Sequence, residues 1–384
     1  MNELLVLSSS KDTAGLVVVD ASTGGSTGIP PFKSCLADIG GNVCSLGNSV
    51  CSNFSGISAY SGDYIAVSQS KKPCIQIYRY SRPQPLFTCH LQEIVTSLDS
   101  YFTYLIAGTK NGWIYCWNWT TGELISSRQA HMKSISRLKI SKANGQFCVT
   151  TSMDGTVKVW ELSQLLDTSI GVGNEPFRSW SPHRLPVTDL YLIDTLTCLR
   201  CVTSSIDRTV AVYDIYSNRL CLKLSFPESL ESLTCSPSND LLCTGSTQGN
   251  IFVVDLSIAT YAVSAAHAEI IRAEEHHNSK IKESIDNRKI SSQSLLNGLP
   301  KGTNVLEGHS KPITAMLFSF DTTTLITSSE DGMLKFWNIW SRQCIRECLP
   351  LNKLPITNCL VSFSPHTLTQ LHSIHWSIHH QTFT

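Results

Sequence analysis

Residues 307–339 read EGHSKPITAMLFSFDTTTLITSSEDGMLKFWNI, and this stretch decides the fold. Its turn residue, Asp331, is followed by alternating side chains and by Trp337 six positions later. Apolar and β-branched residues that alternate on both sides of a glycine-containing turn are typical of paired β-strands. The stretch therefore predicts a strand, a turn and a second strand.

The same cassette recurs along the chain. Asn111 to Trp117, Asp154 to Trp160 and Asp207 to Tyr213 keep the spacing, and weaker copies end on aromatic or apolar anchors at Tyr78 and Val254. Three of the five spacings between anchors match a four-stranded propeller blade of about 40 to 45 residues. A repeat that cannot bury its own apolar face must stack on its neighbours, so the period predicts a β-propeller.

The two chain ends supply the rest of the predicted ring. Residues 4–25 read as two strands, and residues 355–363, PITNCLVSF, read as a single strand. Together they complete one further blade. We therefore expect an all-β fold with seven blades over residues 1–363, closed by pairing of the N- and C-terminal strands, which removes free sheet edges.

These residues resemble the WD-repeat family, so the expected fold is a seven-bladed WD40 β-propeller. In that family a His, a Ser or Thr, the turn Asp and the Trp form a buried hydrogen-bond relay within a blade. The resemblance implies three structural relay sets, with Tyr213 departing from the usual Trp: His131, Thr150, Asp154 and Trp160; His183, Thr203, Asp207 and Tyr213; and His309, Thr327, Asp331 and Trp337.

The same three sets of residues also match the residue types of a catalytic site. A buried Asp that orients a His beside a hydroxyl is also hydrolase chemistry. However, an enzyme needs one such set at one pocket, whereas three copies at the blade period indicate a structural role. The chain also has no phosphate loop or HExxH helix. We expect no catalytic residue, no cofactor and no small-molecule substrate.

Composition limits the function further. Hydrophobic residues make up 42% of the chain and the formal net charge is zero, which favours a compact protein and gives no basic footprint for direct binding of nucleic acid. No apolar run matches a membrane span, and no secretory signal opens the chain. Cys198 and Cys201 have a zinc-like spacing without a second ligand pair, so no metal site is expected.

Two insertions interrupt the repeat. Residues 163–181 predict a loop with a short helical start. Residues 257–304 are rich in helix formers and predict a helical or disordered insertion, which would either grip a partner or remain a solvated excursion. Residues 364–384 predict a short, disordered, His-rich tail.

The order of the blades resembles one particular group, the WD-repeat subunit of the rixosome, a nuclear complex that matures the large ribosomal subunit; its plant members are named after a root-initiation defect. The resemblance rests on residues 183–192, 204–220, 246–256 and 307–348. It implies a non-catalytic scaffold in ribosome biogenesis and rRNA processing that contacts an α-helical repeat protein and an AAA ATPase, and reaches the pre-ribosome indirectly.

That resemblance implies a nuclear location, in the nucleolus or nucleoplasm, with the cytoplasm as the second expected place. Members of the group continue into a C-terminal helix suited to self-association, and we expect this product to lack it. A competing interpretation is the substrate receptor of a cullin-type ubiquitin ligase. It calls for Arg two residues after a Trp-Asp pair, and the corresponding residues here are Ser163, Tyr216, Ser257 and Trp340.

Protein partners are expected on the face where the loops between blades converge. Residues just before the turn aspartates and just after the blade histidines should lie on this face. The expected contact positions are Lys133, Met153, Arg184, Ile206, Lys311 and Glu330.

Overall fold

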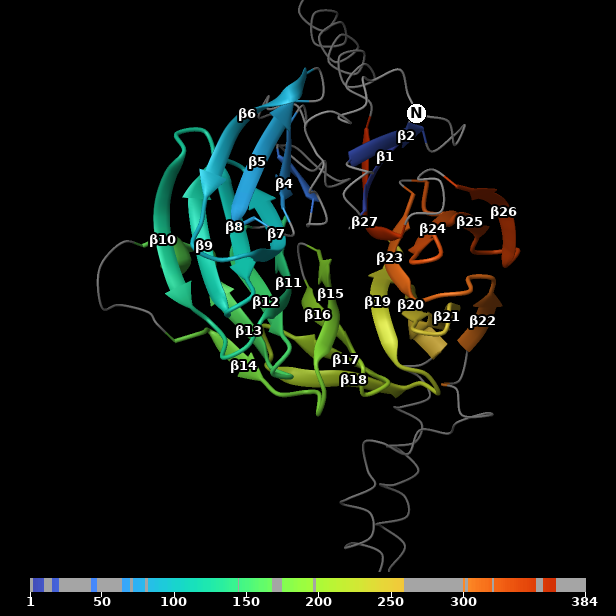
Figure 1. Ribbon diagram of the computed structural model, residues 1–384. Helices are drawn as coiled ribbons and strands as arrows, with labels where there is room; N and C mark the ends of the chain where they lie inside the picture. Colours follow the sequence, from blue (N-terminus) through green and yellow to red (C-terminus); the bar gives the residue numbers. More distant parts are fainter. Residues whose placement is uncertain are drawn as a thin grey trace, which may run out of the picture.

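The computed structural model describes residues 3–9, 16–20, 43–46, 64–69, 72–79, 82–143, 145–167, 175–195, 198–258, 300, 303–319, 321–349 and 355–363. Strands make up nearly all the regular structure of these residues. The described helical residues are those of the short helix α1 (Leu162–Leu166) and residues 256–258, each following a strand. The strands form sheets that lie side by side around a common centre (Figure 1). The fold is all-β and propeller-like.

Six sheets have four antiparallel strands each, and each of these six consists of strands that are consecutive in the chain. The first sheet consists of β3 (Val43–Leu46), β4 (Tyr64–Ser68), β5 (Cys74–Arg79) and β6 (Arg82–His90). The second consists of β7 (Val95–Tyr101), β8 (Tyr104–Thr109), β9 (Trp113–Asn118) and β10 (Glu123–Gln129). The third consists of β11 (Ile135–Ile140), β12 (Phe147–Ser152), β13 (Val157–Glu161) and β14 (Arg178–Trp180).

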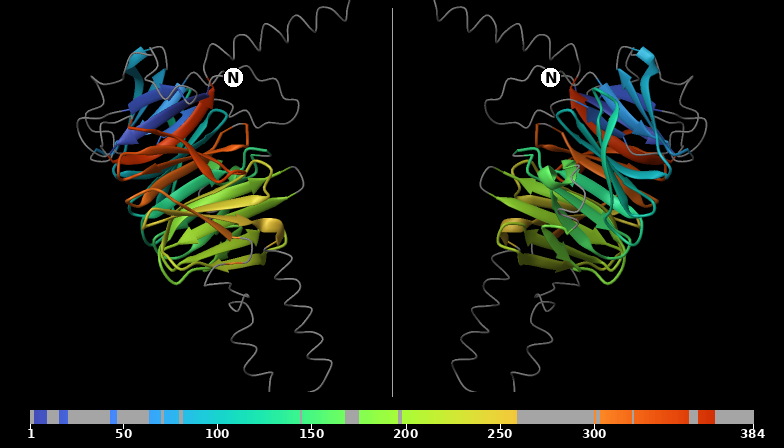
Figure 2. Two further views of the ribbon diagram at one scale, coloured as in Figure 1. Left: turned by 90° about the vertical axis from the view of Figure 1, so that its right-hand side faces the viewer. Right: turned by 90° about the vertical axis from the view of Figure 1, so that its left-hand side faces the viewer.

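The remaining three four-stranded sheets repeat this arrangement (Figure 2). The fourth consists of β15 (Val187–Asp194), β16 (Leu199–Ser205), β17 (Thr209–Asp214) and β18 (Arg219–Ser225). The fifth consists of β19 (Leu230–Cys235), β20 (Leu241–Ser246), β21 (Asn250–Asp255) and β22 (Thr303–Glu307). The sixth consists of β23 (Ile313–Phe318), β24 (Thr324–Ser329), β25 (Leu334–Asn338) and β26 (Gln343–Cys348).

A further sheet joins the two ends of the described chain. Its central strand β1 (Glu3–Ser9) pairs antiparallel with β2 (Leu16–Asp20) on one side and with β27 (Ile356–Phe363) on the other. β27 also contacts β23 of the sixth sheet and β3 of the first. The strands expected at residues 4–25 and 355–363 are therefore present and paired.

The first predicted insertion is partly wrong. α1 supplies the helical start expected within residues 163–181, but Arg178–Trp180 pair with β13 and complete the third sheet as its outer strand. This strand was missed because three residues are too few to show an alternating pattern. It follows that the third sheet has the same four strands as its neighbours.

The second insertion and the tail lie mostly outside the described residues. The insertion interrupts the connection from β21 to β22, and its predicted end at residue 304 is too late, because Thr303 and Asn304 already pair with β21. Residues 259–299 and 364–384 are not among those described. Within the described part of the chain, no helix is long and apolar enough to span a bilayer.

The hydrophobic core lies between neighbouring sheets. Ile114 and Cys116 of the second sheet pack with Leu138 and Trp160 of the third, and all four side chains are buried. The sixth sheet and the sheet of β1 share a similar cluster, in which Leu7 belongs to β1. Each sheet thus buries its apolar faces against the neighbouring sheets. This need for burial is the physical reason for the repeat.

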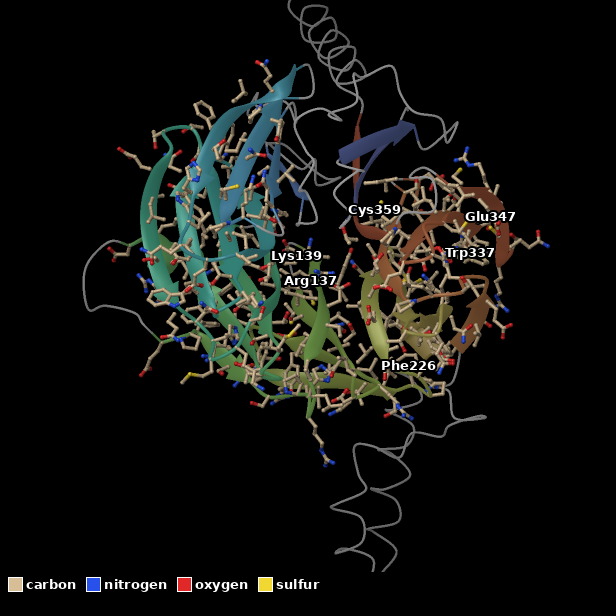
Figure 3. The ribbon with its side chains drawn as sticks, in the orientation of Figure 1. Arg137, Lys139, Phe226, Trp337, Glu347 and Cys359 are labelled. Carbon is tan, nitrogen blue, oxygen red and sulfur yellow. The ribbon has the colours of Figure 1, made fainter. Side chains whose placement is uncertain are left out.

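Polar contacts near the centre also link the sheets. Asp189 on β15 accepts a hydrogen bond from Arg137 Nε on β11 at 2.9 Å and another from the Leu233 backbone N–H on β19 at 2.8 Å. Arg137 and Lys139 lie toward the centre of the sheets in Figure 3. A single carboxylate therefore ties three adjacent inner strands together.

Candidate functional site

The third sheet brings together all four residues of its predicted set. His131 Nε2 lies 2.9 Å from Thr150 Oγ1, and Trp160 Nε1 donates to the same oxygen at 3.1 Å. On the other side of the ring, His131 Nδ1 lies 3.4 Å from Asp154 Oδ2. His131, which precedes β11, therefore connects strands β12 and β13 with the turn between them.

One direction of hydrogen donation satisfies the whole set. The Trp160 N–H donates to Thr150, whose hydroxyl donates to His131 Nε2; His131 Nδ1–H then faces Asp154. This order requires a neutral imidazole. Burial lowers the pKa of His131 by more than Asp154 raises it, which agrees with the neutral form. Burial alone would raise the pKa of Asp154, but hydrogen bonds from His131 and Thr156 bring it well below its ordinary value.

The sixth sheet repeats the arrangement with a direct contact to the carboxylate. Trp337 Nε1 lies 3.0 Å from Thr327 Oγ1, which lies 2.8 Å from His309 Nε2. His309 Nδ1 is 3.1 Å from Asp331 Oδ2. Burial again lowers the pKa of His309, and the pKa of Asp331 lies below its ordinary value because backbone and His309 hydrogen bonds outweigh burial.

The fourth sheet brings together only three of its four predicted residues. His183 Nε2 is 2.9 Å from Thr203 Oγ1, and His183 Nδ1 is 3.3 Å from Asp207 Oδ2. Tyr213 does not join them in the described structure. Its ring stacks on Trp180 of β14, with ring centroids 4.6 Å apart and an angle of 16° between the planes. Tyr213 therefore packs between the third and fourth sheets, against Trp180, instead of donating to the threonine as Trp160 donates to Thr150.

Two threonines belong to these sets although the sequence analysis did not name them. His131 Nδ1 is 3.0 Å from Thr156 Oγ1, which donates to Asp154 Oδ1 at 2.5 Å. Thr209 makes the same contacts with His183 and Asp207, at 2.9 and 2.6 Å. The available signal was a Thr two residues after the turn Asp, which Met333 replaces in the sixth sheet.

The third and sixth sets have the atomic order of a Thr-His-Asp triad, but their hydroxyls are out of reach. Thr150, Thr203 and Thr327 each have 0% of their surface exposed. A nucleophile must contact its substrate, and a fully covered hydroxyl cannot. The geometry therefore ties strands together and offers no reaction site at these residues.

The described residues contain no cluster of metal-ligating side chains. No group of three or more His, Cys, Asp or Glu side chains there could hold a metal ion. Cys201 is fully buried and its pKa is raised by burial, whereas Cys198 is half-buried. The described cysteines are free thiols.

The six expected contact positions are all exposed, and they lie where loops meet the turns after the second strands. In the third sheet, Met153 N donates to Ser134 O at 2.9 Å, so its turn is held to the loop that begins at His131. Ile206 and Glu330 make the equivalent bonds to Pro186 O and Pro312 O, at 3.3 and 3.1 Å. The six residues are Lys133, Met153, Arg184, Ile206, Lys311 and Glu330.

A glycine makes this close fit of turn and loop possible. Gly155 has φ +84°, which L side chains rarely adopt, and a Cβ placed on it would lie 2.9 Å from His183 O of the next sheet. The turn of the third sheet therefore lies directly against the loop of the fourth. We refer to the surface formed by these loops and turns as the loop face.

Comparison with known protein families agrees with the repeat. The family described as WD domain, G-beta repeat matches residues 122–161 and 300–338. These two segments hold β10 to β13 and β22 to β25, and therefore contain the Trp160 and Trp337 sets. WD repeats are thus present in the chain.

Several curated proteins are similar over most of the chain. WD repeat-containing protein 18 of Danio rerio is 26% identical over 309 residues, covering 79% of this chain and 64% of that protein. Pre-rRNA-processing protein IPI3 of Scheffersomyces stipitis is 26% identical over 348 residues, covering 79% and 66%. Pre-rRNA-processing protein pro-1 of Caenorhabditis briggsae is 25% identical over 347 residues, covering 89% and 58%. The chain spans less than two thirds of the length of these relatives.

Among solved structures, the computationally designed protein Ika8 matches with a TM-score of 0.59 and 18% sequence identity, covering 92% of this chain and 86% of that one. At this identity the likeness concerns the fold alone. The chain contains WD repeats and has an all-β, WD40 propeller-like fold, and it is similar to WD repeat-containing protein 18 and to the pre-rRNA-processing protein IPI3.

Proposed function

We propose that this protein is a non-catalytic scaffold subunit of a nuclear complex that acts in large ribosomal subunit assembly and rRNA processing. The observation that carries the proposal is its similarity, over 79% of the chain, to a protein named for pre-rRNA processing. The neutral net charge supports arrival at the pre-ribosome through protein contacts, because direct binding to RNA depends on neutralising phosphates with excess positive charge.

The scaffold would be one closed ring of seven blades over residues 1–363. Support comes from the contacts between inner strands, which run from β3 through β7, β11, β15, β19 and β23 to β27, and from β27 back to β3. A closed ring of blades leaves only short outer sheet edges and suits a platform that presents loops in fixed positions. The insertion between β21 and β22 and the tail at 364–384 would be additions to this single domain.

The three histidine sets would serve this platform as structural relays. Each ties a loop to the strands of its own sheet through buried, paired polar groups, which is the arrangement expected of a stabilising element. The loops that they hold carry the expected partner-contact residues. Stability of the relays and availability of the loop face are therefore linked.

The proposed partners are an α-helical repeat scaffold and an AAA ATPase, with the pre-ribosome reached through them. The proposed location is the nucleus, in the nucleolus or nucleoplasm, with cytoplasm as a second place. Nuclear extract of cells that express a tagged chain should yield these assembly proteins, identified by mass spectrometry. Recovery in the absence of RNA, after nuclease treatment, would show that proteins carry the association.

Depletion of the protein tests the function itself. Unprocessed precursors of large-subunit rRNA should accumulate, as measured by hybridisation, and re-expression of the chain should restore processing. The proposal fails if precursor levels stay unchanged on depletion. Recovery of cullin adaptors together with unchanged precursors would favour the ubiquitin-ligase receptor instead.

A further inference from the structure

Exposed apolar side chains gather on one part of the loop face. Met132 is 87% exposed, Met153 50%, Leu185 47% and Ile206 39%. All four lie in the loops and turns of the third and fourth sheets. We call these four residues the apolar patch.

Backbone hydrogen bonds hold the segments of the patch together. The turn of Met153 is bonded to the loop of Met132 through Ser134 O, and the turn of Ile206 is bonded to the loop of Leu185 through Pro186 O. Between the two sheets, a Cβ placed on Gly155 would lie 3.5 Å from Leu185 O. The four segments therefore follow one another without a gap across the boundary between the sheets.

The turn positions equivalent to Met153 and Ile206 are polar in the second, fifth and sixth sheets. The backbone N–H that bonds the loop belongs to Met153 and Ile206 in the patch, but to Lys110, Thr247 and Glu330 elsewhere. The residue directly after the relay histidine is Met132 in the third sheet and Ser310 in the sixth. The patch is thus a local departure from the repeat and not a general property of the fold.

The exposed charges around the patch have one sign. Lys133, Arg184 and Arg208 are exposed on the same loops and turns. The carboxylates of this region, Asp154 and Asp207, face inward to His131 and His183. An apolar surface with a positively charged border complements a ligand that is apolar and negatively charged.

We propose that the apolar patch is the docking site for a peptide segment of a partner protein that combines apolar side chains with acidic residues. This rests on the proposed scaffold role. Apolar side chains of the peptide would pack on the surface between Met153 and Leu185. Its acidic side chains would face the positive charges of Lys133, Arg184 and Arg208. RNA is less well matched, since single-stranded RNA sites use aromatic side chains for stacking and the patch has none.

A selection of random short peptides displayed on phage, carried out on the purified chain, tests the chemistry. Peptides that combine apolar and acidic residues should be enriched. The test variant is Met132→Ser with Met153→Glu, which places in the third sheet the residue types that the sixth sheet carries at Ser310 and Glu330. It should weaken the selected peptides by roughly tenfold or more, measured by fluorescence anisotropy.

The matched control is Ser310→Glu, which adds one negative charge to the same face outside the patch and should leave peptide affinity unchanged. Thermal melting of all variants checks that they fold. The proposal is overturned if no apolar acidic peptides are enriched, if their binding ignores the test variant, or if the variant instead loses binding to a single-stranded RNA oligonucleotide. Because this assay uses purified protein, it can fail while depletion still raises precursor rRNA, and it can succeed while depletion has no effect.

Discussion

The sixth and fifth sheets have the same four-stranded order and the same glycine-containing turn between their second and third strands, but of the two only the sixth has a relay. At the position of His309 the fifth sheet has Phe226, and at the position of Trp337 it has Val254. Phe226 and Trp337 are labelled in Figure 3. The pairing of Leu233 with Thr244 in the fifth sheet matches that of Met316 with Thr327 in the sixth.

Thr244 shows what the missing histidine leaves behind. Its Oγ1 is buried and has no hydrogen-bond partner in the described structure, whereas Thr327 Oγ1 contacts both His309 and Trp337. Phe226 packs on Phe252 with ring centroids 5.4 Å apart. At this position a sheet of this fold therefore has either a polar hydrogen-bonded set or apolar packing. We expect the hydrogen bonds of the sixth sheet to add stability to a sheet that can form without them.

The largest loss is expected when the indole of the relay is removed. Trp337 is 4% exposed, and Trp337→Ala should cost about 3–5 kcal/mol because it leaves a cavity and removes a donor to Thr327. Urea unfolding measures this. The control Trp340→Ala, at a side chain 73% exposed, should change the free energy of unfolding by less than about 0.5 kcal/mol. Equal midpoints for parent and Trp337→Ala would contradict the packing role.

Removal of a relay carboxylate should have a smaller effect. Asp331→Ala and Asp154→Ala each leave a buried His N–H or a backbone N–H without its acceptor, which costs about 1–3 kcal/mol. Melting temperatures should fall for both variants. Gln248→Ala, at the equivalent and exposed position of the relay-free sheet, is the matched control and should melt like the parent. Unchanged melting with loss of a chemical activity would revive the catalytic interpretation.

Acid should weaken the relay sheets before it affects the fifth sheet. His131 and His309 have folded pKa values below their ordinary value of 6.5, so the unfolded chain binds more protons as the pH falls below that value. Stability therefore decreases with falling pH through this window. The folded pKa values of Asp154 and Asp331 lie below their ordinary value of 3.8. As the pH falls below 3.8, these two carboxylates therefore cause a further loss of stability.

The free energy of unfolding, measured from neutral to acid pH, tests how much the relay histidines contribute to this dependence. His309→Phe, which copies Phe226 of the fifth sheet, removes one titrating group and should make the dependence on pH shallower. A slope equal to that of the parent would show that His309 does not contribute. Phe226→Leu retains an apolar side chain and should leave the slope as it is.

The smallest effect is expected at Thr244. Thr244→Val removes a buried hydroxyl that has no partner, so the change should be neutral or stabilising, within about 1 kcal/mol. Thr327→Val removes the same group where it is bonded and should destabilise by about 1–3 kcal/mol. If both substitutions cost the same, the difference between the two sheets would not lie in the relay.

Much of the repeat was predictable from the chain alone. The spacing of Asp331 and Trp337 and the position of His309 indicated which residues meet, because residues in a short antiparallel repeat are related by local turns and short strands. The set at His183 was predictable only in part. Whether an aromatic ring donates to Thr203 or stacks between sheets depends on its neighbour, and Trp180 comes from another sheet and from a strand of only three residues.

The strand pattern, the positions of the blade histidines and the apolar content could be read from the chain, since they follow from alternation and period within single repeats. The link that Asp189 makes between three inner strands, and the common surface of Met132, Met153, Leu185 and Ile206, became visible only in the folded molecule. Both depend on how neighbouring sheets are placed. That placement is set by the packing of side chains distant in sequence, and such packing cannot be predicted from a local sequence pattern.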